Sequence, residues 1–418
     1  MKSYCFLRII AFILVIITSG NAQQLSNAWG TYHEDLEKIR TELKQERQDS
    51  LAIKQLIRDA ELAMGLDTFS VVNNSPIPPS GNKKDYYSWA PYLWPNPDTK
   101  DGLPYISKDG KTNPETDMKS DKPQLRRMTM AVQTLGLAYY YTQDKRYAHK
   151  AATLLKGWFL DPETGMNPNL NYGQAIPGEV EGRSSGIIDT RWYIILMNSI
   201  KLLNNSDALT SMDMLHLKSW FEDYLNWLLT NKMGQEEAQS ENNHGTWYAA
   251  QIASFALFTD NIQLTKNVVN NSRKFFDSQL DSLGRQIHEL RRTKSFDYSL
   301  YNIHALINLA MIAEQVDIDL WHYNAESKKN LYNAIRYMAD HYYSDKDWPY
   351  EQISEKVITL NYENGLDFSV YYPYDLYTAL RVGYKVYQDP LFMKSMEKIS
   401  VDKVKAHRSN LLIYLEQR

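Results

Sequence analysis

Asparagine and histidine stand side by side in the segment 241–248, ENNHGTWY, at the predicted start of an apolar helix. The unpaired N–H groups and the dipole at a helix N-terminus favour an anion, and they keep a histidine neutral and basic. Asn243 is equally suited to cap this helix. Taken alone, the pair has an ordinary interpretation, in which Asn243 is the cap and His244 makes a local hydrogen bond.

Two further segments place cations and amides where a loop enters a helix. In the segment 289–299, ELRRTKSFDYS, a cluster of cations precedes Tyr298. In the segment 169–191, amide side chains precede Arg191. Each also has an ordinary interpretation. The segment 289–299 could be a solvated basic turn with a packed tyrosine, and the segment 169–191 could supply helix caps and a surface pair of Asp189 and Arg191. The first two junctions have complementary chemistry that still needs an explanation, and for the segment 169–191 both interpretations stay open.

Asn, neutral His, Arg and Tyr together suit proton abstraction beside a carboxylate. In a 4-linked uronic acid the C5 proton lies next to the carboxylate, whose charge must be neutralised before the proton can leave. Asn243 and Arg292 are suited to bind this carboxylate, and each well-placed donor contributes on the order of 3 kcal/mol. The base is then His244 or an ionised Tyr298, and Tyr298 as the acid protonates the departing O4. The expected outcome is β-elimination.

Helices must position these residues. No proline occurs between Pro177 and Pro349, and apolar residues recur there with a period of about 3.6. Segments with strand-like alternation are scarce, so the predicted fold class is all-α, a ring of helical hairpins. A tetratricopeptide solenoid is disfavoured because no repeat of about 34 residues is found. The predicted helices are 125–139, 147–158, 187–203, 212–229, 246–258, 262–280, 299–316, 329–343 and 368–387.

The segment 70–122 is the exception, because it is rich in proline and aromatic residues. Structureless segments of this length inside a compact domain are usually lids or binding loops, although some are packed irregular structure. Tyrosine and tryptophan combine an apolar face with a hydrogen-bonding tip, which suits a polar ligand. We therefore expect this loop to form a wall of the cleft, with Tyr86, Tyr87, Trp89 and Tyr92 along the sugar path.

Several motifs in consistent order make the chain resemble the alginate lyase superfamily, and within it polysaccharide lyase family 38. They span roughly residues 86–352 and are YSWAPYLWP (87–95), NPNLNY (167–172), IIDTR (187–191), NNHGTW (242–247), Arg292 with Tyr298-Ser299, and WPY (348–350). The resemblance implies an (α/α) toroid of about six or seven hairpins and no catalytic metal or other cofactor.

The resemblance also implies roles for individual residues. Asn243 and Arg292 correspond to carboxylate neutralisers, His244 to a base or neutraliser, and Tyr298 to the acid that also serves as base. The family spacing selects Arg291, whereas the local pattern favours Arg292. The residues expected to contact the sugar chain are Tyr87, Trp89, Tyr92, Gln174, Arg191, Glu236, Asn242 and Arg291.

The composition and the N-terminal sequence limit which partners and which cellular compartment are expected. The chain has 418 residues, 30 of them tyrosine, and a net charge of −4, which offers no footprint for nucleic acid. Residues 1–22 have the pattern of a secretory signal, and residues 23–418 are expected to be one domain. Without Lys2 and Arg8, 44 basic residues face 50 acidic ones, a charge of −6. We expect an exported protein without a membrane span, in the periplasm or medium. Removal of the signal would also remove Cys5, the single cysteine. The cations of the mature protein, Lys84 and Lys294 among them, are expected to gather in the cleft.

The stereochemistry of elimination depends on the base. In β-D-mannuronate and β-D-glucuronate, H5 and O4 lie on the same face, so one tyrosine can take and give the proton. A guluronate linkage needs His244 opposite Tyr298. The prediction is a preference for polymannuronate or glucuronan. Two alternatives stay open, an inverting glycoside hydrolase that uses carboxylates among Glu236, Glu237, Glu241 and Asp297, and an exported glycan-binding protein without activity.

Overall fold

The computed structural model describes residues 33–45, 51–74, 76–344, 346–359 and 374–416. The predicted signal sequence, Cys5 and the first part of the predicted helix 368–387 lie outside them. Ten of the described helices form five consecutive pairs, each with one inner and one outer member. The inner helices are α5 (Lys122–Thr142), α7 (Tyr193–Leu202), α10 (Asn243–Phe258), α13 (Ser295–Glu314) and α15 (Leu376–Tyr387). The outer helices are α6 (Lys145–Phe159), α8 (Ser211–Thr230), α11 (Ile262–Asn271), α14 (Leu331–Tyr343) and α16 (Pro390–Glu397).

Two of the inner helices, α10 and α13, have sequences that are apolar on nearly every side. Nearly every residue of α10 and α13 is buried, and the two helices pack directly against each other. By contrast, only Thr265 and Val269 are buried in the outer helix α11. A helix with one apolar stripe lies at the surface, whereas one that is apolar all round must be enclosed. The all-α toroid predicted from the sequence is confirmed.

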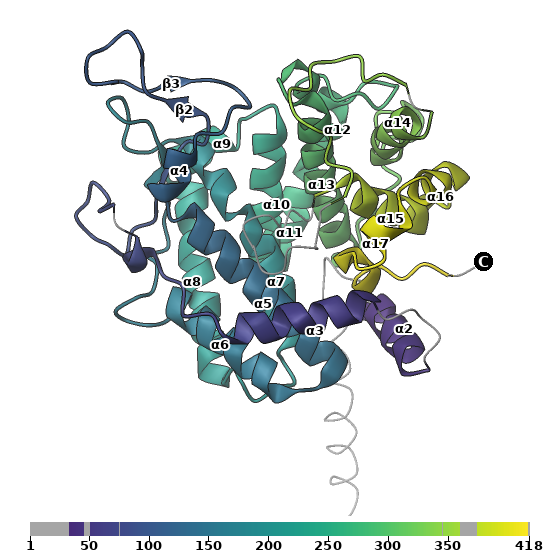
Figure 1. Ribbon diagram of the computed structural model, residues 1–418, viewed down its shortest axis with the longest axis horizontal. Helices are drawn as coiled ribbons and strands as arrows, with labels where there is room; N and C mark the ends of the chain where they lie inside the picture. Colours follow the sequence, from purple (N-terminus) through teal and green to yellow (C-terminus); the bar gives the residue numbers. More distant parts are fainter. Residues whose placement is uncertain (1–32, 46–50, 75, 345, 360–373, 417–418) are drawn as a thin grey trace, which may run out of the picture.

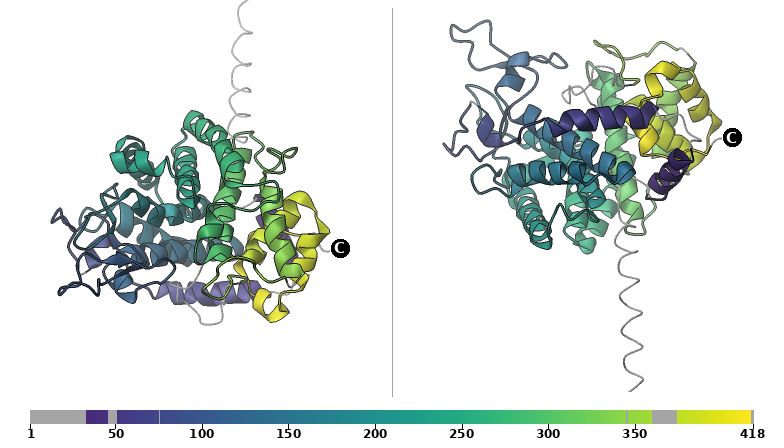
Figure 2. Two further views of the ribbon diagram at one scale, coloured as in Figure 1. Left: turned by 90° about the horizontal axis from the view of Figure 1, so that it is seen from above. Right: turned by 60° about the horizontal axis from the view of Figure 1, so that its bottom comes forward.

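The first and the last described segments meet and close the ring. Helices α2 (His33–Lys44) and α3 (Leu51–Met64) lie beside the C-terminal helices (Figures 1 and 2). Asp35 of α2 pairs with Lys385 of α15 at 2.5 Å, and Asp59 of α3 pairs with the buried Arg408 at 2.7 Å. Helix α3 packs against α5 and η5, so the N-terminal helices lie between the first and the last of the five pairs.

Several predicted helices differ from the observed ones. The segment predicted as one helix over 187–203 begins as a 3₁₀ helix, η3 (Ser184–Trp192), and becomes α-helical only at α7. The segment 262–280 is two helices, because α11 ends before Ser272 and α12 (Arg273–Gln279) follows. Helices α2, α3 and α16 were not predicted, and neither were the short elements α4 (Pro114–Met118), α9 (Lys232–Glu237), α17 (Val401–Val404), η2 (Val71–Asn73), η4 (Glu289–Arg291) and η5 (Arg408–Leu411).

The aromatic segment 70–122 folds over one end of the ring and is held there by short strands. In Figure 1 its β2 and β3 region projects beyond the helices. Strand β1 (Tyr87–Trp89) pairs in parallel with β4 (Tyr172–Ala175), and β2 (Leu93–Trp94) pairs antiparallel with β3 (Ile106–Ser107). No helix among the described residues is long and apolar enough to cross a membrane.

Candidate active site

The N-terminus of α10 carries the Asn-His pair. Asn242 is the cap, since its side chain accepts the backbone N–H of His244 at 3.0 Å, and the expectation that Asn243 caps the helix is wrong. Asn243 is instead fully buried and donates its backbone N–H and its Nδ2 to the two carboxylate oxygens of Glu289, at 2.7 and 2.9 Å. Its Oδ1 has no hydrogen-bond partner among the described residues.

A buried carboxylate orients His244. Glu237, at the end of α9, is 2% exposed, and its Oε1 lies 2.6 Å from Nδ1 of His244. A carboxylate accepts only, so Nδ1 carries the hydrogen of this contact and the other ring nitrogen, Nε2, remains for chemistry. The sequence argument for a neutral histidine did not include this anionic partner.

Arg292 lies flat on the ring of Tyr298, with its guanidinium carbon 3.7 Å from the ring centroid. Tyr298 is in the first turn of α13, and its hydroxyl lies 2.7 Å from the hydroxyl of Tyr92 on the aromatic loop. Asp109, on the same loop, receives two hydrogen bonds from Arg292. The aromatic loop and the start of α13 therefore contact each other at the side chain of Tyr298.

The surroundings shift the pKa of each of these groups. Burial raises the pKa of Tyr298 well above its ordinary value, the neighbouring Tyr92 adds to this, and the Arg292 guanidinium works in the opposite direction. Burial works to raise the pKa of Asp109, but the hydrogen bonds from Arg292 and Thr293 outweigh it and lower that pKa to about 2. Burial also raises the pKa of Glu289, against the hydrogen bonds from Asn243. A strongly raised Tyr298 pKa keeps the phenol protonated at neutral pH.

These groups form one cluster at the N-termini of α10 and α13. Glu289 binds Asn243 directly and interacts electrostatically with Arg292 and His244, so it lies between the two halves of the cluster. Arg191, from the end of η3, lies 5.1 Å from the ring centroid of Tyr301, which packs against Tyr298. Two helix N-termini and two guanidinium groups make this the place in the described chain that suits an anionic substrate.

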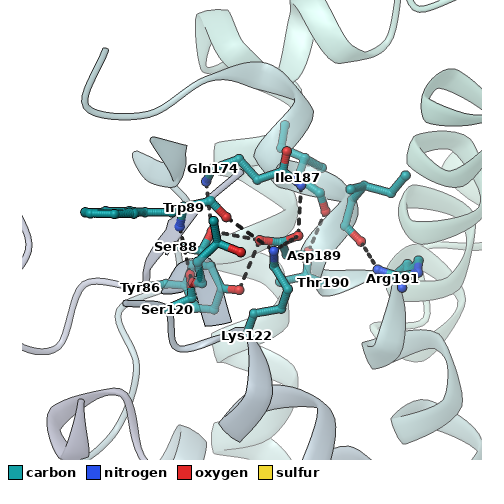
Figure 3. Close-up of polar contacts among 12 residues, drawn as sticks. Tyr86, Ser88, Trp89, Ser120, Lys122, Gln174, Ile187, Asp189, Thr190 and Arg191 are labelled. Carbon is teal, nitrogen blue, oxygen red and sulfur yellow. Dashed lines mark hydrogen bonds and ion pairs between the residues drawn. The ribbon is translucent and has the colours of Figure 1, made fainter. Parts of the chain in front are cut away.

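A second polar network, behind the cluster, fixes the aromatic loop. Figure 3 shows the side chains of Tyr86, Ser88 and Gln174 converging on Asp189 of η3. Asp189 accepts hydrogen bonds from their Oη, Oγ and Nε2 atoms at 3.2, 2.8 and 3.0 Å. All four residues are buried. Asp189 therefore joins the two strands β1 and β4 to the inner ring, rather than forming a surface pair with Arg191.

Of the predicted sugar contacts, Tyr86 and Gln174 are buried, whereas Glu236 and Arg291 are exposed. Tyr86 is therefore wrong as a residue of the sugar path, because its hydroxyl is used by Asp189 inside the protein. Gln174 is buried, and its side chain is used by Asp189 and by Arg183, which donates to its Oε1 at 3.0 Å. Glu236 is exposed and lies 3.6 Å from Lys232 on the same helix. Arg291 is exposed, whereas Arg292 contacts Tyr298.

The remaining predicted residues lie on the loop or around it. Tyr87 and Trp89 are partly exposed and are joined by a hydrogen bond of 2.8 Å from the indole nitrogen to the phenol oxygen. Lys84 is not gathered into the cluster, since its ammonium donates to the carbonyl of Pro162 at 3.0 Å. The cations expected in the cleft are thus only partly concentrated there. Among the described residues no group of His, Cys, Asp and Glu side chains is arranged to hold a metal ion.

Three acidic residues of the cluster were not identified as partners of the catalytic candidates. Glu237 was considered only as an acid for hydrolysis, and Asp109 and Glu289 were not singled out. Asp109 and Arg292 are 183 positions apart, so no local pattern joins them. The one available signal was Glu237 itself, a carboxylate seven residues before His244.

The comparisons with known proteins agree with this geometry. The family model described as alginate lyase matches residues 70–348, which is more than half of the chain. The chain belongs to the alginate lyase family.

Solved structures of alginate lyases resemble this protein over nearly its whole chain. An alginate lyase from Bacteroides ovatus is 32% identical, with a TM-score of 0.84, and the match covers 92% of this chain and 98% of that one. Two variants of alginate lyase A1-III are 13% identical, with TM-scores of 0.56 and 0.57, over 94% of this chain and 96% and 97% of theirs, and they share the fold. No curated protein sequence matches the chain. The protein is a polysaccharide lyase of the all-α toroid type.

Proposed function

We propose that this lyase cleaves alginate, with a preference for mannuronate-rich chains, or glucuronan, by β-elimination at a 4-linked uronate. One observation carries the proposal, the guanidinium of Arg292 stacked on Tyr298 where the aromatic loop contacts α13 through Tyr92. The A1-III lyase variants were solved as complexes with a tetrasaccharide, and they share the fold of this chain. Guanidinium groups and helix N-termini beside an aromatic loop suit an anionic sugar polymer.

In the proposed reaction the C5–H and C4–O4 bonds break and a C4–C5 double bond forms. Arg292 reduces the negative charge on the uronate carboxyl group, so that C5 can lose its proton. His244 can add to this only in its protonated form, in which Nε2 also carries a hydrogen. Asn243 lies below them, and Nδ2 has a second hydrogen beyond the one that Glu289 accepts. Asn243 is fully buried. It can donate to the substrate carboxylate only if the residues that bury it move when substrate binds.

Tyr298 is the proposed acid, and also the base on a same-face linkage. Its raised pKa keeps it protonated before the substrate binds, which sets the phenol to protonate the departing O4. To act as the base it must first lose this proton. Arg292 over its ring is the charge that stabilises the phenolate. On an opposite-face guluronate linkage, His244 Nε2 is the proposed base.

The decisive assay is digestion of polymannuronate, polyguluronate, glucuronan and hyaluronan, followed by the ultraviolet absorbance of the unsaturated product. We expect the fastest absorbance increase on polymannuronate or glucuronan. In Tyr298→Phe we expect a loss of at least about 10²-fold in kcat, because one general acid–base group contributes about 10²–10⁴. The matched control is Tyr343→Phe, which removes the same atom from an exposed tyrosine.

Three results would contradict the proposal in different ways. Activity on polyguluronate alone refutes the same-face preference. New reducing ends without ultraviolet absorbance indicate a hydrolase. Binding of polymer without any cleavage indicates a glycan-binding protein. We also propose that the chain is exported and that residues 23–418 act as one domain, which N-terminal sequencing of secreted protein and limited proteolysis would test.

A further inference from the structure

Asp109 of the aromatic loop is bound at four points to the residues that precede Tyr298. Its Oδ1 lies 2.5 Å from Nη2 of Arg292 and its Oδ2 lies 3.2 Å from Nε. Oδ2 also accepts the backbone N–H and the hydroxyl of Thr293, at 3.2 and 3.0 Å. A loop carboxylate that accepts four hydrogen bonds is a built contact, much stronger than a surface ion pair.

The next residue, Gly110, lets the loop come this close. Its φ is +72°, in the left-handed region, and a Cβ there would collide with the Thr293 hydroxyl. Glycine is the residue that accepts both conditions. The backbone of the loop is therefore shaped to bring Asp109 against Arg292.

The contact restricts what Arg292 can do. Asp109 takes Nε and Nη2, and one face of the guanidinium lies on the Tyr298 ring. Nη1 and the second hydrogen of Nη2 are left outside the Asp109 pair for a substrate carboxylate. The guanidinium plane is thus set before substrate arrives, and this preorganisation reduces the entropy lost on binding the transition state.

We propose that Asp109 is a positioning residue, which holds Arg292 flat against Tyr298 and so couples the aromatic loop to the acid–base group. The inference rests on the proposed function of Arg292 and Tyr298. A competing role predicts the opposite result, because an Asp109 that occupied the site of the substrate carboxylate would inhibit the enzyme, and its removal would raise activity.

The first test compares Asp109→Ala and Asp109→Asn with Asp98→Asn, an exposed carboxylate on the same loop. In Asp109→Ala we expect kcat on polymannuronate to fall by about 10–100-fold, because a misplacement of about 1 Å at a reacting group costs about 10². The expected change in KM is less than about threefold. Asp109→Asn keeps an acceptor oxygen for the arginine and should lose less, while Asp98→Asn should match the wild type.

The second test is the pH dependence of kcat. The charged and titratable groups around the Tyr298 phenol are Tyr92, Arg292 and Asp109, and among these Asp109 raises the pKa of Tyr298 while Arg292 lowers it. Asp109→Asn removes a negative charge and leaves Arg292 in place. The limb that reports ionisation of Tyr298 should therefore move to lower pH, by about half a pH unit or more. A residue that only supported the fold would leave this limb unchanged.

A double-mutant cycle completes the test. If Asp109 acts through Arg292, then Asp109→Ala should change kcat by less than about twofold in an Arg292→Ala background. The inference is overturned if Asp109→Ala is as active as Asp98→Asn, is more active than the wild type, or gives additive losses in the cycle. If Asp109→Ala does not fold, Asp109→Asn decides by the same criteria. A wild-type enzyme inactive on every uronate polymer would instead overturn the proposed function.

Discussion

Glu237→Gln isolates the contribution of the buried carboxylate to His244. Glu237 is 2% exposed and lies 2.6 Å from Nδ1, so the substitution exchanges one charge-assisted hydrogen bond for a neutral one with almost no change in shape. Its neighbour Glu236 is exposed and pairs with Lys232 of its own helix, at 3.6 Å. Glu236→Gln therefore makes the same chemical change one residue away, outside the cluster.

The expected loss follows from the hydrogen-bond energies. A charge-assisted bond contributes about 1.5–3 kcal/mol and a neutral one about 0.5–1.5 kcal/mol, a difference of about 1–2 kcal/mol. If His244 gains positive charge in the transition state, this difference lowers kcat by about 5–30-fold. If the new amide donates to Nδ1 instead, the ring is forced into the tautomer without a basic Nε2. On a guluronate linkage, where His244 is the proposed base, the loss then reaches about 10⁴-fold, by comparison with a protease histidine in the wrong tautomer.

The assay is the initial rate of double-bond formation on polymannuronate, with thermal unfolding to show that both variants are folded. We expect Glu236→Gln to have wild-type kcat. The reasoning is refuted if folded Glu237→Gln stays within twofold of Glu236→Gln, because the buried carboxylate then neither orients nor stabilises the imidazole.

Two further predictions concern stability. Asp189→Asn should lower the free energy of unfolding by about 1–3 kcal/mol in urea denaturation, because an amide group then meets the Gln174 donor and Lys122 loses its anion; unchanged stability would show that the network is dispensable. Burial lowers the pKa of His304 from 6.5 to about 4. As the pH falls from 6.5 to 4, this histidine is therefore protonated in the unfolded chain but still neutral in the folded protein. Its contribution lowers the free energy of unfolding by about 3 kcal/mol over that range. His304→Gln should lose less over that range in parallel denaturation curves, and an equal loss in both proteins would contradict the assignment.

The fold class and the catalytic candidates could be read from the sequence because both depend on local patterns. Helices α10 and α13 are apolar all round over many residues, and a gap in proline accompanies them. The Asn-His pair and Tyr298 stand at the starts of these two helices, and the ring brings the starts together. Order along the chain thus predicted which segments meet.

Boundaries and partners were less predictable. The 3₁₀ geometry of η3 depends on its packing against β4 and α10, which no periodicity reveals. Gln174 has the residue type of a sugar ligand, yet its side chain is used within the protein by Asp189 and Arg183. Composition cannot distinguish an amide that faces a ligand from one that completes a buried network.

The sequence by itself determined that this chain is a helical toroid with Asn243, His244, Arg292 and Tyr298 as its chemical candidates. Only the tertiary structure decided which carboxylate serves each of them. Glu289 binds Asn243 and Asp109 binds Arg292 across separations of 46 and 183 residues. Hydrogen bonds and charge act over a few ångströms of space whatever the separation along the chain, so the partners of a catalytic group become visible only when the chain has folded.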